Sequence, residues 1–211
     1  DELLAHLLAL SNPTLATYIK PDGIYLRITA KAQEAAEAEH MIAQREADIR
    51  EIFAPYIWGT DNDTLDSVVG ALLKAKNLSL ATMESCTEGL LSSIIASSSE
   101  SSSYFKGGLI ACCDEAKTAF GIEPYIIKSK ESSQIAEAMA EVARKNLKAD
   151  IGLGIADTAN LGEKAGNIFI GLNSDKLKRT ITCNLVGNRL RIKQRAVYAA
   201  LFELRRILRG A

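Results

Sequence analysis

Four consecutive residues, Glu84-Ser85-Cys86-Thr87, bring together a carboxylate, two hydroxyls and a thiol. They follow residues 78–82, which alternate as in a short strand, and precede apolar residues at helical spacing from Leu90 onward. Backbone N–H groups at a helix start lack intrahelical partners and carry partial positive charge, so an oxyanion or a phosphate can be held there. The pattern indicates a nucleophile beside an anion site. The alternative is that Ser85 or Thr87 only caps the helix.

The base that would activate such a nucleophile is not a nearby histidine. The sequence has two histidines, His6 and His40, and both lie in the first part of the chain. A Ser-His or Cys-His arrangement within residues 66–211 is therefore excluded. A lysine is the usual substitute, and Lys117 is one candidate. Cys86 is a second possible nucleophile, but a cysteine at a buried helix start more often packs as a small apolar residue.

The composition indicates a globular protein with a substantial core. The chain has 211 residues, 47% of them hydrophobic, which suits one large domain or two small ones. No apolar run approaches the roughly 20 residues that span a membrane, and the acidic start does not resemble a signal peptide. Four cysteines stand without metal-ligand spacing. We therefore expect a cytoplasmic protein with reduced thiols, no bound metal and no membrane partner.

Charge divides the chain into two parts. Residues 1–65 hold 11 acidic and 5 basic side chains, a net charge of −6, whereas residues 66–211 hold 15 acidic and 20 basic, a net of +5. An anionic ligand is expected to prefer the second part. Arg189 opens a basic stretch there that could hold a phosphate or simply face solvent.

Residues 1–63 are predicted to form a small α+β module. Its expected elements are a helix, two strands and a long helix, at residues 2–10, 14–20, 24–30 and 33–53. This order resembles a K-homology-type fold. The module has no G-x-x-G loop and is acidic, and both features argue against a nucleic-acid partner. A packing or spacer role is the simpler interpretation.

Residues 64–211 are predicted to form an α/β domain with three layers, α/β/α. Strands and helices alternate, and the strands are continuously apolar, which is typical of a sheet covered on both faces. The expected helices are 64–76, a helix from Thr87 onward, 114–120, 132–147 and 189–209; the expected strands are 78–82, 109–113, 151–156, 168–172 and 177–183.

Several motifs together resemble one known family. They are Ala81 to Thr87, Tyr104 to Gly108, Glu115-Ala116-Lys117, Ala138-Met139-Ala140 and Gly187-Asn188-Arg189. Residues 66–209 resemble the C-terminal domain of the CinA (competence-damage-inducible) family, the nicotinamide mononucleotide deamidases. Residues 1–63 resemble the family's K-homology-type middle module. The family's usual first domain, similar to molybdopterin-binding domains, has no counterpart in this sequence. The resemblance also implies a homodimer.

The resemblance implies a reaction and a site. The family removes the amide of the nicotinamide ring, giving nicotinic acid mononucleotide and ammonia, without a metal or cofactor. Carried over, Ser85 attacks the carboxamide carbon, Lys117 transfers the proton, and helix-start N–H groups near Thr87 stabilise the oxyanion. Arg189 and the serine-rich loop 97–103 are candidates for the 5′-phosphate of this small nucleotide. The residues expected to contact substrate are Glu84, Cys86, Thr87, Gly89, Gly108, Cys112 and Arg189.

The sequence departs from the family's pattern at three places. Glu88 replaces a glycine, Cys112 replaces a tyrosine, and residues 156–162 replace a glycine-rich loop and add Asp157. Glycine-rich loops let backbone N–H groups reach a ligand, and a carboxylate repels an anion. Two hypotheses follow. One is an amidohydrolase that retains Ser85 and Lys117, and the other is an inactive homologue that binds a nucleotide or serves as an assembly module.

Overall fold

The computed structural model describes residues 2–157 and 165–210, which form two compact units, 1–59 and 60–211. The sequence placed residues 60–63 in the first module, but the structure places them in the second unit. There the Thr60 N–H donates to the Asp63 carboxylate (2.9 Å), and the Asp63 N–H donates to the Thr60 carbonyl (2.9 Å). This turn leads directly into the first helix of the second unit.

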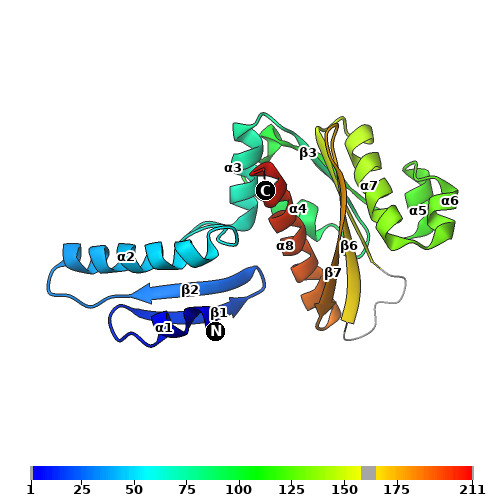
Figure 1. The fold of residues 1–211 in the computed structure, drawn as a ribbon. Helices are drawn as coiled ribbons and strands as arrows, with labels where there is room; N and C mark the ends of the chain where they lie inside the picture. The colour runs from blue at the N-terminus through cyan, green and yellow to red at the C-terminus, as the bar shows by residue number, and fades with distance from the viewer. Residues whose placement is uncertain (1, 158–164, 211) are drawn as a thin grey trace. The chain divides into compact units, whose positions relative to one another are not determined.

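The first unit has the α+β order that the sequence predicts (Figure 1). Its elements are η1 (Glu2–Leu4), α1 (Ala5–Leu8), β1 (Thr14–Lys20), β2 (Gly23–Thr29) and α2 (Ala35–Phe53). The two strands pair as an antiparallel hairpin, from Thr14 opposite Thr29 to Lys20 opposite Gly23. Its small core contains Leu4, Leu7, Leu15 and Ile49. The K-homology-like expectation is confirmed at the level of fold.

The second unit is a mixed five-stranded sheet with helices on both faces. Its helices are α3 (Leu65–Ala75), α4 (Leu90–Ala96), η2 (Ser101–Ser103), α5 (Asp114–Ala119), α6 (Pro124–Ser129), α7 (Ser132–Asn146) and α8 (Arg189–Leu208). Its strands are β3 (Leu80–Glu84), β4 (Phe105–Ile110), β5 (Ile151–Asp157), β6 (Ala165–Asn173) and β7 (Lys178–Val186).

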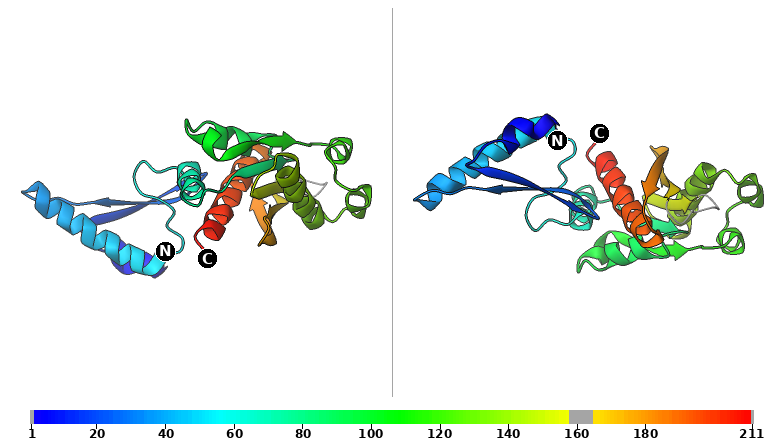
Figure 2. Two further views of the ribbon diagram at one scale, coloured as in Figure 1. Left: turned by 90° about the horizontal axis from the view of Figure 1, so that it is seen from above. Right: turned by 90° about the horizontal axis from the view of Figure 1, so that it is seen from below.

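The strands lie in the order β4-β3-β5-β6-β7. The central strand β3 is parallel to β4 and β5, whereas β6 and β7 continue the sheet in antiparallel pairing. Figure 2 shows α7 and α8 on opposite sides of the sheet. The expected three-layer α/β/α arrangement is thus confirmed.

Glycines allow α7 to approach the sheet closely. A Cβ built at Gly152 would lie 1.8 Å from the Ala140 carbonyl oxygen, and one at Gly154 would lie 2.3 Å from the Ala136 carbonyl oxygen. Side chains of α7, including Met139, then complete the core on this face. This packing holds the middle of the sheet rigid, and β3 lies within it.

Three sequence predictions differ from the structure. The helix predicted from Thr87 begins at Leu90, because residues 86–89 form a turn. The strand predicted at 109–113 is β4 at 105–110, because Gly107 and Gly108 continue the strand instead of ending it. The sequence analysis did not predict α6, although Pro124 in its first turn is a recognised start signal.

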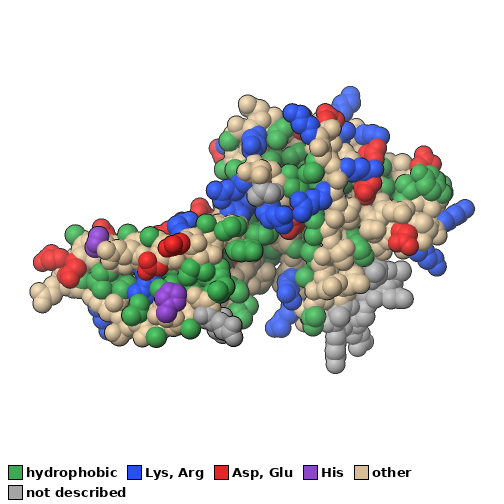
Figure 3. Space-filling view, viewed as in Figure 1, with side chains coloured by type: hydrophobic (Ala, Val, Ile, Leu, Met, Phe, Trp, Pro, Cys, Tyr) green, Lys and Arg blue, Asp and Glu red, His purple; other side chains and the backbone are tan. Residues whose placement is uncertain are grey.

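In the described residues no helix has the length and apolarity needed to cross a membrane. Figure 3 shows Lys and Arg side chains gathered around α8 in the second unit, and acidic side chains on α2 in the first. The charge division seen in the sequence therefore coincides with the division into units.

Candidate active site

Ser85 lies where three parallel strands end together. It directly follows β3, and its N–H donates to the Ile155 carbonyl of β5 (3.0 Å). On the other side, the Ala111 N–H donates to the Glu84 carbonyl (2.8 Å). The carboxyl ends of β3, β4 and β5 thus form one edge, the usual place for a ligand on an open α/β sheet.

The side chain of Glu84 points into the fold and is fully buried. Its carboxylate accepts hydrogen bonds from the N–H groups of Leu91 (3.0 Å) and Ser92 (2.8 Å), and from the Ser92 hydroxyl (2.5 Å). These N–H groups belong to the first turn of α4, so Glu84 satisfies donors that are otherwise orphaned at a helix start. Glu84 therefore holds the helix rather than facing the open edge where a substrate would lie.

This arrangement changes two expectations. Neither Ser85 nor Thr87 caps α4, because the N-cap residue is Gly89, in a left-handed conformation with φ +89°. The first-turn N–H groups of α4 bind Glu84, so they are not free to stabilise an oxyanion. A donor that stabilises an oxyanion would therefore have to come from the turn around Thr87. Thr87 is fully buried, and its hydroxyl has no hydrogen-bond partner among the described residues.

Ser85 and Lys117 are both buried near this edge. Ser85 is 6% exposed and Lys117 is 9% exposed. Lys117 lies on α5, where its ammonium donates to the exposed Asp114 carboxylate one turn earlier (3.0 Å). The polypeptide from β4 to α5 thus brings a buried cation to the end of the sheet where the Ser85 hydroxyl lies.

Asp157, the last residue of β5, adds a carboxylate to the same edge. Burial raises the pKa of Asp157 above its usual range, and the positive charges of Lys117 and Arg189 oppose this rise. Lys117 and Arg189 are 72 residues apart in sequence (189 − 117), yet both lie near enough to Asp157 to act on its pKa. The rest of the expected loop, residues 158–162, lies outside the described residues.

Cys86 is poorly suited to act as the nucleophile. Burial, together with the negative charges of Asp157 and Glu84, raises the pKa of its thiol to about 12. The thiolate is the reactive form, so Cys86 is unreactive at neutral pH. Cys112 is exposed, and its thiol donates to the Ser85 carbonyl (3.6 Å). Of the adjacent nucleophiles, Ser85 is therefore favoured.

Arg189 already has an acceptor within the chain. Its guanidinium donates to the carboxylate of Glu88 (2.8 Å), and Lys193, one turn further along α8, binds the other oxygen (2.5 Å). These hydrogen bonds lower the pKa of Glu88. The expected phosphate ligand Arg189 is thus paired with the residue that departs from the family's pattern.

The expected glycines serve the turn and the sheet. A Cβ on Gly108 would lie 2.1 Å from the Ser92 hydroxyl, so this glycine makes room for the group that donates to Glu84. A Cβ on Gly89 would lie 2.7 Å from Ile110.

We find Gly108 and Glu84 in supporting positions, whereas Ser85, Cys86, Cys112, Lys117 and Arg189 gather at the edge. The sequence analysis gave no role to Lys193 or Asp114. Their spacing from Arg189 (i+4) and Lys117 (i−3) could have shown that they lie on the same helix face as those residues.

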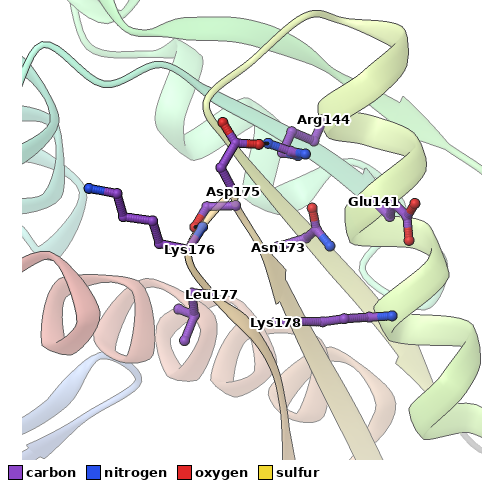
Figure 4. A pocket seen from close by; sticks show the side chains of 8 residues that line it. Glu141, Arg144, Asn173, Asp175, Lys176, Leu177 and Lys178 are labelled. Atoms are coloured by element: carbon purple, nitrogen blue, oxygen red, sulfur yellow. Dashed lines mark hydrogen bonds and ion pairs between the residues drawn. The ribbon is translucent and has the colours of Figure 1, made fainter.

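One hollow lies at the opposite end of the sheet. It has a volume of about 520 Å³ and is lined by Glu141, Arg144 and residues 173–178 (Figure 4). Asn173 pairs with Gly152 at the start of β5, whereas the Ser85 edge lies at that strand's end. Arg144 and Asp175 form an ion pair there (2.5 Å). Ser174 lines this hollow, but its hydroxyl accepts from the Lys176 N–H (3.3 Å) in a turn away from the Ser85 edge, so we do not place the chemistry there.

Within residues 2–157 and 165–210, no group of three His, Cys, Asp or Glu side chains could hold a metal ion.

The fold and the site define a two-part protein, a K-homology-like module followed by an α/β domain with a buried serine and lysine at one edge of its sheet. The family profile "CinA C-terminal domain" matches residues 62–208, and "Damage-inducible protein CinA KH domain" matches residues 1–59. The chain belongs to the CinA family.

Relatives and solved structures agree with this membership. A competence-damage inducible protein of Moorella thermoacetica is 38% identical over 100% of this chain and 53% of its own length, and one of Clostridium perfringens is 33% identical over 99% and 52%. The chain thus spans about half the length of these relatives. A competence or damage-inducible protein from Enterobacter asburiae has a similar structure, with 27% identity and a TM-score of 0.64 over 70% of this chain and 99% of that one.

The raised pKa of Cys86 predicts selective thiol labelling. With iodoacetamide at pH 7.5, we expect Cys112 and Cys113, which are exposed, to be alkylated, and Cys86 to react at least about 100-fold more slowly because so little thiolate is present. Peptide mapping by mass spectrometry measures the three rates. Comparable rates at Cys86 and Cys113 would contradict this account of the site.

The raised pKa of Asp157 predicts that Asp157→Asn increases the stability of the fold in a pH-dependent way. At neutral pH the folded state carries a partly desolvated carboxylate, so Asp157→Asn should increase the free energy of unfolding. The gain should be full above the folded-state pKa and should vanish as pH falls towards the unfolded value of about 3.9, because the parent carboxyl is then protonated in both states. Denaturant unfolding across this pH range measures it. Asp175→Asn, at an exposed ion pair, is the control and should give no such gain.

Proposed function

We propose that the second unit hydrolyses the carboxamide of nicotinamide mononucleotide to nicotinic acid mononucleotide and ammonia, with Ser85 as nucleophile and Lys117 as base. The observation that carries the proposal is the presence of a buried serine and a buried lysine where β3, β4 and β5 end. Membership of the CinA family supports the same reaction by the resemblance described above.

The chemistry divides between these two side chains. Lys117 is an ammonium paired with Asp114 in the structure, so it must first release a proton to water. The resulting amine takes the proton of the Ser85 hydroxyl as the oxygen attacks the carboxamide carbon. The C–N bond of the tetrahedral intermediate then breaks, and Lys117 returns the proton to the departing ammonia. Water attacks the acyl-serine in the same way and releases the acid. Ser85 is fixed for this role because its backbone is bonded to β5, and Asp114 positions the Lys117 amine.

The developing oxyanion would lie against the turn that follows Ser85. The buried Thr87 hydroxyl is a spare donor in this turn among the described residues. A donor held in place by the fold stabilises a developing charge without reorganisation. The role that sequence reasoning gave to the helix start is therefore reassigned to the turn itself.

The second hypothesis, an inactive homologue that binds a nucleotide or serves in assembly, draws support from Glu88. Its carboxylate holds Arg189 and Lys193, the cations that a substrate phosphate would use. A homodimer stays a prediction from the resemblance.

Ammonia release from nicotinamide mononucleotide distinguishes the two hypotheses. We expect the parent to release ammonia, and Ser85→Ala to lower the rate by about 10³-fold or more because the nucleophile is lost. Ser11→Ala, at an exposed serine of the first unit, is the matched control and should keep the parent rate. Activity in Ser85→Ala equal to that of the parent would remove Ser85 from the mechanism. No release by any folded variant would favour the inactive homologue.

A further inference from the structure

A carboxylate of the chain itself lies between two cations near Ser85. Arg189 and Lys193 are one turn apart on α8 and face the same way, and each binds one oxygen of Glu88, at 2.8 and 2.5 Å. Glu88 is 101 residues away from Arg189 in sequence. The contact therefore joins the turn after β3 to the start of the last helix.

The turn holds Glu88 in a conformation that side chains rarely adopt. Its φ is +54°, in the left-handed region where glycine is the usual residue. Gly89 follows with φ +89°. A glutamate is thus present at a position whose backbone suits glycine, and its side chain is bound at both carboxylate oxygens. Two hydrogen-bonded cations compensate for an unfavourable backbone conformation.

This ion cluster lies at the Ser85 edge. The Glu88 N–H donates to the Ser85 carbonyl (3.2 Å), so the two residues belong to one turn. Arg189 also interacts electrostatically with Asp157. A ligand whose amide reaches Ser85 would therefore extend its remaining groups towards these cations.

The charges decide which ligand suits the cluster. Arg189 and Lys193 together carry +2, which would match a phosphate monoester of charge −1.5 to −2. With Glu88 ionised between them the sum is +1, and both cations already have an acceptor. A phosphate would have to displace Glu88 or lie beside a like charge.

We propose that Glu88 occupies the position of a substrate phosphate, so that the Ser85 site prefers a nicotinamide nucleoside with an uncharged ribose over the phosphorylated nucleotide. This inference rests on the proposed amide hydrolysis and narrows its substrate class. Asp157 adds a further negative charge at this edge, which disfavours a phosphate and suits the positively charged pyridinium ring that both substrates carry.

The test compares kcat/KM for nicotinamide riboside and nicotinamide mononucleotide in the parent, Glu88→Gly and Glu88→Gln. We expect the parent to prefer the riboside. Both variants should shift the ratio towards the mononucleotide by about tenfold or more, because removing a unit charge a few ångströms from a phosphate changes its binding by at least a decade. Glu141→Gln, which breaks an ion pair with Lys145 on α7 towards the opposite end of the sheet, is the matched control and should leave the ratio unchanged. A parent that prefers the mononucleotide, or a ratio unchanged in both variants, would overturn the proposal.

Binding of inorganic phosphate keeps the test independent of catalysis. Calorimetry should show phosphate binding Glu88→Gln at least about tenfold more tightly than the parent, with the gain lost when Arg189→Gln is added. Equal phosphate affinity in parent and Glu88→Gln would contradict the role of Glu88 even if the amide is hydrolysed. If neither substrate is hydrolysed but the phosphate result holds, the proposed reaction fails while the assignment of Glu88 stands.

Discussion

The buried carboxylate of Glu84 determines how the central strand continues into the next helix. It ends β3 and accepts two backbone N–H groups and one hydroxyl from the start of α4. An ionised group with no solvent exposure is costly unless it is fully hydrogen-bonded, and these three donors compensate for that cost. Because both ends of the turn are held, the residues between Glu84 and Leu90 have little freedom. Ser85 is therefore fixed at the edge of the sheet.

The remaining groups of the site are positioned by the other strand ends and by α8. β4 leads to α5 and delivers Lys117, β5 delivers Asp157, and α8 begins with Arg189. The result is an edge in which cations and carboxylates alternate: Lys117 has Asp114, and Arg189 has Glu88. Burial keeps Cys86 as a thiol, which leaves the serine as the competent nucleophile. The proposed amide hydrolysis would draw on Ser85 and Lys117, while Glu88 is bound to the cations that would hold a substrate phosphate.

Local patterns predicted most of the helices and strands, because apolar periodicity records which face of an element is buried. The fold class followed from the alternation of helices with continuously apolar strands, and the expected grouping of Ser85 with Lys117 and Arg189 came from the family resemblance. The predicted start of α4 was wrong because the start depends on Glu84, whose carboxylate binds the first-turn N–H groups. The sequence analysis had expected Glu84 to contact substrate instead. The role of Glu88 could not be inferred from local sequence, because its partner Arg189 is 101 residues away. Contacts of this kind exist only once the strands and α8 are placed.

Amide hydrogen exchange at Leu91 and Ser92 tests the central claim, that the Glu84 carboxylate holds the turn containing Ser85. In Glu84→Gln we expect both amides to exchange about tenfold faster or more, because a hydrogen bond to a charged group contributes about 1.5–3 kcal/mol to stability. The amides of α7 should keep their parent rates, as should all of these amides in Glu115→Gln, a change at an exposed residue of α5. Unchanged exchange at Leu91 and Ser92 in Glu84→Gln would contradict the account.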